Sequence, residues 1–83
     1  MFYVYIIELI DGSYYVGHTA NLERRWSEHL SGVVCMHTKK IQVKKLLWSE
    51  VQSDRKTARI REKEIKGWRH EKKERLWLDS SLP

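Results

Sequence analysis

The stretch FYVYIIELIDGSYYVGHT, residues 2–19, decides the fold of the chain. Residues 2–10 are rich in aromatic and β-branched side chains, and apolar residues stand at both odd and even positions, as in a strand that is covered on both faces. The dipeptide DG interrupts this run, and the strand pattern resumes over residues 13–19. The two runs therefore predict a β-hairpin.

The length of the hairpin loop determines which side chains share a face of the sheet. A two-residue turn at the DG dipeptide would pair Tyr5 with His18 and send Tyr15 to the opposite face. A three-residue loop with a left-handed bulge at its glycine would instead place Tyr5, Tyr15 and Gly17 on the same face. The residues of the hairpin leave both registers open.

A helix is predicted from the cap residue Asn21 to about Ser31. On a helical wheel its inward arc consists of Leu22, Trp26, His29 and Leu30. Arg25 lies at the edge of this arc, whereas Arg24 points away as a solvated charge. The two adjacent arginines are therefore expected to differ in role. Residues 33–44 read as an irregular segment.

The second half of the chain predicts a strand and two helices. Residues 45–51 read as a third strand, and a helix is expected from Asp54 to about Trp68. The inward arc of this helix consists of Ala58, Glu62 and Ile65. Ile60 falls outside the arc, so a short helix over residues 72–78 is expected to cover it. The sequence thus predicts one α+β domain over residues 1–83, with a three-stranded, mainly antiparallel sheet flanked by three helices.

Glu62 is placed in the middle of an apolar helix face, where a carboxylate needs a partner. Burying it unpaired would cost several kcal/mol or raise its pKa until it became neutral. One explanation is a buried ion pair with Arg25 that links the two long helices. The other explanation is a functional site.

Composition and charge narrow the classes of partner. The chain has 83 residues and a formal net charge of +5, which favours a polyanionic partner, although charge alone does not separate nucleic acid from an anionic membrane. No apolar run approaches the length of a membrane span, and no signal segment is evident, so we expect a soluble, cytoplasmic protein that makes no membrane contact. The single cysteine, Cys35, excludes an internal disulfide and is expected to be a small buried side chain.

Four separated elements resemble the GIY-YIG nuclease domain, in particular a small stand-alone form similar to the N-terminal nuclease domain of the excinuclease C subunit. YVY at residues 3–5 and YVG at residues 15–17 stand where the two family motifs are expected, with tyrosine in place of the first glycine and valine in place of the second isoleucine. Arg25 follows ten residues after the second tyrosine. The run ARIREKEIKGW at residues 58–68 resembles the later family helix that carries the metal-binding glutamate, here Glu62.

This resemblance implies an endonuclease that hydrolyses DNA phosphodiester bonds with one divalent metal ion, Mg²⁺ or alternatively Mn²⁺. Glu62 would hold that ion, and Arg25 would stabilise charge on the phosphoryl oxygens. Because the family needs both phenols in one site, the resemblance selects the three-residue hairpin loop. We then expect the carboxylate, the guanidinium and the two phenols to converge around one hollow that is open to solvent.

The resemblance also assigns the groups that would move protons. Tyr5 would accept a proton from the attacking water, and Tyr15 would position that water or share the role of base. An unperturbed phenol has a pKa of about 10, so it needs activation by its neighbours. The metal ion, Arg25 and one of two histidines would lower that pKa or relay the proton. These histidines are His18, where many relatives carry lysine, and His29, which matches a histidine in part of the family.

The basic residues are expected to track the phosphate backbone of the nucleic acid. The residues assigned to this role are Lys39, Lys40, Lys66 and Arg69. The implied setting is DNA repair or recombination, and cutting both strands would require either a homodimer or a second encounter with the DNA. The alternative is a catalytically weak or inactive nucleic-acid-binding module of the same fold, and a less favoured one is a protein-interaction adaptor with an incidental basic face.

Overall fold

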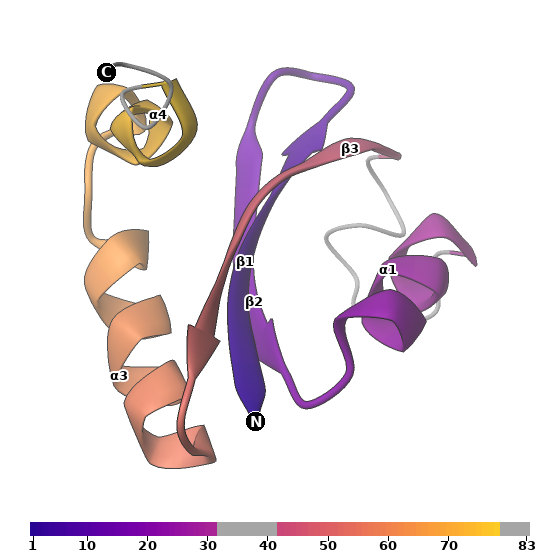
Figure 1. Cartoon of the computed structure of the whole chain (residues 1–83). Helices are drawn as coiled ribbons and strands as arrows, with labels where there is room; N and C mark the ends of the chain where they lie inside the picture. Colours follow the sequence, from indigo (N-terminus) through magenta and orange to yellow (C-terminus); the bar gives the residue numbers. More distant parts are fainter. Residues whose placement is uncertain (32–41, 79–83) are drawn as a thin grey trace.

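The computed structural model describes residues 1–31 and 42–78, which form one sheet with helices on both faces (Figure 1). The elements in chain order are β1 (Phe2–Leu9), β2 (Tyr14–Thr19), α1 (Leu22–Ser31), β3 (Val43–Gln52), α3 (Arg55–Lys66) and α4 (His70–Leu78). The strands have the order β2-β1-β3, and both pairs are antiparallel. Helix α1 covers one face, and α3 and α4 cover the other. The predicted α+β fold with a three-stranded sheet is confirmed.

The hairpin has the register of a three-residue loop. The backbone N–H of Leu9 donates to the carbonyl of Ser13 at 2.9 Å, so residues 10–12 form the loop. The backbone N–H of Gly12 donates to the carbonyl of Leu9 at 2.9 Å, and Gly12 has a φ of 87°, in the left-handed region that suits glycine. Tyr5 consequently lies opposite Gly17 across the β1–β2 ladder. This register puts the two phenols of the predicted site on the same face of the sheet.

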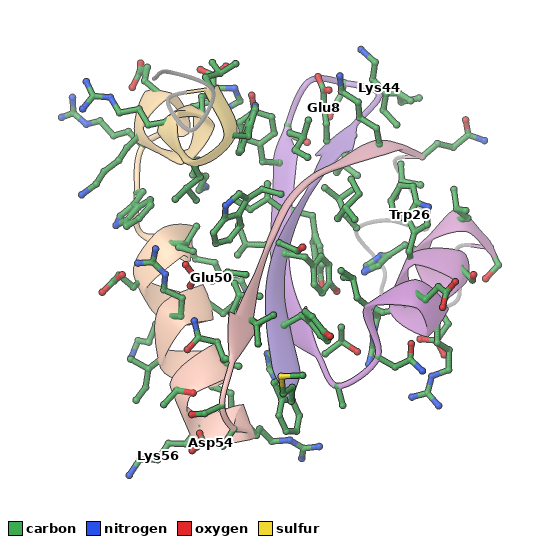
Figure 2. The ribbon with its side chains drawn as sticks, viewed as in Figure 1. Glu8, Trp26, Lys44, Glu50, Asp54 and Lys56 are labelled. Atoms are coloured by element: carbon green, nitrogen blue, oxygen red, sulfur yellow. The ribbon has the colours of Figure 1, made fainter. Side chains whose placement is uncertain are left out.

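The central strand β1 separates two apolar cores, which explains its apolar residues at both parities. On the α1 side the buried residues are Tyr5, Ile7 and Leu9, and Trp26 packs against them from α1 (Figure 2). On the other side the buried residues are Val4, Ile6, Val16, Ala58 and Ile65. Burying apolar residues on both faces stabilises the fold by roughly 25 cal/mol for each Å² removed from water.

Both long helices begin at the predicted cap residues. The side chain of Asn21 accepts a hydrogen bond from the backbone N–H of Arg24 at 3.0 Å, and that of Asp54 accepts one from Thr57 at 2.8 Å. Helix α3 ends at Lys66, two residues before the predicted end, because Gly67 caps it. Strand β3 begins at Val43, within the segment predicted to be irregular.

Two packing predictions are wrong. Leu30 and Ile60 are each 59% exposed. Ile60 stays exposed because it lies on the side of α3 away from the sheet, and α4 packs Leu76 and Trp77 against the sheet core instead of covering α3. The predictions for Cys35 and for residues 33–41 as an irregular segment fall on residues 32–41, outside the described part of the chain.

Candidate active site

Tyr5, Tyr15 and His29 form a cluster on the α1 side of the sheet, here called the phenol–imidazole cluster. The Tyr5 hydroxyl and His29 Nε2 are hydrogen-bonded at 2.9 Å, and the two residues are 2% and 1% exposed. The ring centroid of Tyr15 lies 6.3 Å from that of Tyr5 and 5.0 Å from that of His29. The structure therefore brings together three of the residues that the sequence assigned to proton transfer.

The imidazole of His29 is held in its neutral form. Burial, and after it the positive charge of Arg25, lower the pKa of His29 to about 4. At neutral pH the ring therefore has one unprotonated nitrogen. With the ring proton on Nδ1, Nε2 accepts the hydrogen bond from the phenol of Tyr5.

This lowered pKa predicts a loss of stability in mild acid. The unfolded chain binds a proton at His29 near pH 6.5, but the folded protein does so only near pH 4, so stability falls as the pH drops through this window and is unaffected above it. Between pH 7 and pH 5 we expect wild type to lose about 2 kcal/mol of unfolding free energy more than His29→Gln. Urea unfolding of both proteins at both pH values measures the difference. Equal losses of unfolding free energy in wild type and His29→Gln would contradict a neutral His29 in the folded protein.

Gly17 makes room for the Tyr5 hydroxyl. A Cβ at position 17 would lie 2.6 Å from the Tyr5 oxygen and 2.7 Å from its Cζ, and 3.1 Å from a ring carbon of Tyr15. The Tyr5 ring is itself buried against the sheet and held by His29, so it has little freedom to move aside. The glycine is thus part of what places the phenol.

We expect Gly17→Ala to destabilise the protein by about 1–3 kcal/mol, because the added methyl group forces the buried phenol off its position. Gly67→Ala is the matched control: a Cβ there meets its nearest atom at 3.5 Å, an ordinary contact, so no loss is expected. Chemical denaturation measures both. Equal stability of Gly17→Ala and wild type would contradict this expectation, because it would show that the Tyr5 ring can move aside.

Arg25 and Arg24 differ as the helical wheel predicted. The side chain of Arg24 is 69% exposed and that of Arg25 is 33% exposed. Arg25 Nε is buried without a hydrogen-bond partner, and its nearest carboxylate oxygen, on Glu28, lies at 3.6 Å. Because Arg25 also lowers the pKa of His29, its charge acts beside the phenol–imidazole cluster.

Glu62 belongs to a second group on the α3 side of the sheet, here called the Glu62 cluster. His18 Nδ1 lies 2.5 Å from one carboxylate oxygen of Glu62, and Lys66 Nζ lies 2.8 Å from the other. Although burial alone would raise it, these two partners hold the pKa of Glu62 below its ordinary value. The carboxylate is thus charged, and its side chain is 17% exposed.

These contacts overturn the direct ion pair between Arg25 and Glu62. Each residue has a different partner, because α1 and α3 lie on opposite faces of the sheet (Figure 1). The expected single hollow open to solvent is likewise not found among the described residues: the groups divide into two sets of contacts, one on each side of the edge strand β2, and Tyr5 and His29 are almost completely buried.

Gly17 and His18 are consecutive in β2 and face opposite sides of the sheet. Gly17 lies against the Tyr5 hydroxyl on one side, and His18 contacts Glu62 on the other. The two clusters are therefore connected through adjacent residues of β2.

The predicted phosphate contacts have mixed outcomes. Arg69 is exposed, whereas Lys66 is engaged by Glu62. Lys39 and Lys40 lie outside the described residues. The pairing of Lys66 with Glu62 was missed in the sequence, although the spacing of four residues along a helix is the signal for such a pair.

Comparison with known proteins identifies the family. The sequence profile of the GIY-YIG catalytic domain matches residues 1–75. The chain belongs to the GIY-YIG family. This GIY-YIG domain is 40% identical over 74 residues to a UPF0213 protein of Haloquadratum walsbyi, covering 89% of the chain and 83% of that protein. It is 37% identical over 79 residues to one of Natronomonas pharaonis, covering 95% and 93%.

A solved structure supports the same grouping. The solution NMR structure of the UPF0213 protein BH0048 from Bacillus halodurans has a TM-score of 0.60 to this GIY-YIG domain, with 33% identity, and the match covers all of this chain and 89% of that one. Its likeness agrees with the fold described above. No helix within residues 1–31 and 42–78 is long and apolar enough to span a membrane.

GIY-YIG nucleases generally use divalent metal ions, so the Glu62 cluster can be tested for its fit to one. Among the described residues no three His, Cys, Asp or Glu side chains gather as they would around a metal ion. Zinc, which takes three or four protein ligands, therefore does not fit there. Mg²⁺ requires fewer protein ligands, because it keeps several waters and needs only one or two carboxylates besides substrate phosphates, but to bind here it would have to displace Lys66 from one oxygen of Glu62. Glu62 supplies one charged and partly exposed carboxylate of that kind.

Proposed function

We propose that this GIY-YIG domain is an endonuclease that hydrolyses DNA phosphodiester bonds with Mg²⁺, which Mn²⁺ can replace. The observation that carries the proposal is the buried hydrogen bond between the Tyr5 hydroxyl and a neutral His29. A core needs no such pair, since two apolar rings would fill the same space without polar groups to satisfy. In the proposal this pair takes a proton from water that reaches the buried hydroxyl, and the negative charge of the bound phosphate favours the protonated imidazole that results.

Tyr5 and His29 act together as the base. The proton of the attacking water passes to the Tyr5 oxygen as the phenol proton moves to His29 Nε2, 2.9 Å away. The water becomes the nucleophile, the phenol is regenerated, and the imidazole holds the proton that the leaving oxygen finally requires. Tyr15 packs against both rings and fixes their orientation.

Arg25 and Glu62 stabilise the charge of the scissile phosphate. Arg25 presents a guanidinium whose buried Nε has no hydrogen-bond partner beside the cluster, and its planar donors match phosphoryl oxygens as charge builds on them. Glu62 would hold the divalent ion, which supplies charge stabilisation for the scissile phosphate when it is bound. His18 would hold one carboxylate oxygen of Glu62, and the ion would take the place of Lys66 at the other.

A second candidate is a nucleic-acid-binding module of the same fold that turns over little or not at all. Two observations favour it: both oxygens of Glu62 are already engaged, and the candidate catalytic groups lie on two sides of β2. In that case Lys66 would stand permanently where the nuclease needs a metal ion.

Incubation of the purified protein with supercoiled, branched and single-stranded DNA tests the proposal. Cleavage with Mg²⁺ or Mn²⁺, and none with EDTA, is the expected result. Binding without cleavage in every metal would favour the second candidate. Branched substrates are included because we propose a role in DNA repair or recombination in the cytoplasm. Cutting of both strands would call for two copies acting as a homodimer, which the dependence of the products on protein concentration tests.

A further inference from the structure

Positive charge is distributed unevenly over the two faces of this domain. Away from the outer surface of α3 and α4, most cations of the described residues lie within 4.0 Å of a carboxylate. These pairs are Arg24 and Arg25 with Glu28, Lys44 with Glu8, Arg61 with Glu50 and Glu64, and Lys66 with Glu62. The exposed cations of the outer surface form no such ion pair with any described residue. They are Lys56, Arg59, Lys63, Arg69, Lys72 and Arg75.

On α3 these cations form a regular stripe. Lys56, Arg59 and Lys63 follow the i, i+3, i+7 spacing of one helix face, and exposed Ile60 lies among them. This face is directed away from the sheet, because Ala58 and Ile65 occupy the buried side. Figure 2 shows Lys56 extending outward at the start of α3. The four residues line one surface depression.

The stripe is continued by α4, which lies in the same layer as α3 (Figure 1). Arg69, Lys72 and Arg75 line a second depression together with Glu71. Lys72 also lies over the ring of Trp68, with its ammonium 4.6 Å from the ring centroid, so this cation is positioned rather than freely mobile. We call the two depressions together the α3–α4 cationic surface.

We propose that the α3–α4 cationic surface binds the phosphate backbone of a nucleic-acid segment other than the one held at the phenol–imidazole cluster. The inference rests on the proposed function, from which it takes the class of partner. Surface cations without ion-pair partners, aligned along one face of a helix, can neutralise the phosphates of a nucleic acid and release its condensed counterions. The phenol–imidazole cluster lies on the opposite face of the sheet, and Glu62 is on the side of α3 that contacts β2, with its side chain 17% exposed. The stripe faces outward from α3, so the two surfaces hold different segments.

An anionic membrane fits this surface less well. Helices that lie on membranes carry a broad apolar face with Trp, Phe or Leu beside their cations. The apolar face of α3 is already buried against the sheet, and among the described residues Ile60 is the one apolar side chain that lines the stripe depression. A surface with several cations and little apolar area matches a nucleic-acid backbone better than a membrane.

The test compares two triple variants that remove the same charge from different faces. One is Lys56→Gln/Arg59→Gln/Lys63→Gln on the stripe; its control is Arg24→Gln/Lys44→Gln/Lys45→Gln on α1 and β3. Affinity for a fluorescent DNA duplex is measured by anisotropy in EDTA, which prevents cleavage, between 50 and 200 mM salt. We expect the stripe variant to lower the salt slope by about 2.7, which is about 0.9 for each phosphate that the variant no longer neutralises, and the control to change it little. Circular dichroism confirms that both variants fold.

Each outcome decides the proposal separately from catalysis. A lower slope for the stripe variant alone supports the second surface even if wild type never cleaves DNA. An unchanged slope, or an equal fall in both variants, overturns it even if wild type is an active nuclease. Binding to vesicles of phosphatidylserine and phosphatidylcholine completes the test. If the stripe variant loses vesicle binding but binds DNA as wild type does, the proposal is overturned in favour of a membrane partner.

Discussion

Glu62→Gln is expected to lower the rate of Mg²⁺-dependent DNA cleavage by about a thousandfold, which corresponds to about 4 kcal/mol of lost stabilisation of the transition state. The amide keeps the size of the carboxylate and still accepts a hydrogen bond from His18, but it lacks the charge that the metal requires. Single-turnover cleavage of a labelled duplex at saturating protein measures this change without interference from product release.

Glu64→Gln is the matched control for this experiment. Glu64 lies on the same helix and pairs with Arg61 on the exposed side, so its removal should leave the cleavage rate within about twofold of wild type. Isothermal titration with Mn²⁺ adds a readout that is independent of cleavage. Retained activity and retained Mn²⁺ affinity in Glu62→Gln would exclude this carboxylate as the metal ligand.

Arg25→Ala is expected to lower the cleavage rate by about a hundredfold or more, whereas Arg24→Ala should change it little. The reason is the position of each guanidinium: that of Arg25 lies beside His29, and its buried Nε has no hydrogen-bond partner, whereas that of Arg24 is mostly in solvent. Arg25→Lys should recover only part of the rate, because an ammonium group cannot make the two parallel hydrogen bonds of a guanidinium.

Measuring the affinity for a DNA duplex distinguishes a catalytic role of Arg25 from a general effect of its positive charge. Both alanine variants lose one positive charge, so both should weaken duplex binding in EDTA by a similar small factor. Only Arg25→Ala should then fail at the chemical step. Equal losses of cleavage in the two variants would contradict the assignment of Arg25 to the site.

Local sequence signals were sufficient to predict much of the fold. The covering of β1 on both faces follows from apolar residues at both parities, and the caps at Asn21 and Asp54 follow from side chains that accept backbone hydrogen bonds. The three-residue hairpin loop, by contrast, was not decided by the residues around Gly12. It was selected by the family resemblance, and the structure confirms it.

The contacts of the candidate site depend on tertiary structure and were harder to predict. The pairing of Tyr5 with His29 spans 24 residues, and that of His18 with Glu62 spans 44, so neither leaves a local pattern. The division of the site between two faces follows from where α1 and α3 pack. Ile60 was misplaced because the wheel shows which side of a helix a residue occupies but not whether another element lies there.

The central claim is that the phenol–imidazole cluster and Glu62 act on one phosphodiester bond across β2. It is tested most directly by single-turnover cleavage in Mg²⁺ with Tyr5→Phe, Glu62→Gln and the double variant. We expect Tyr5→Phe to slow cleavage by about 10²-fold or more, and the double variant to be no slower than the slower single variant, because groups that act in one step are not additive. Cleavage at the wild-type rate by Tyr5→Phe, or full additivity of the two losses, would contradict the account.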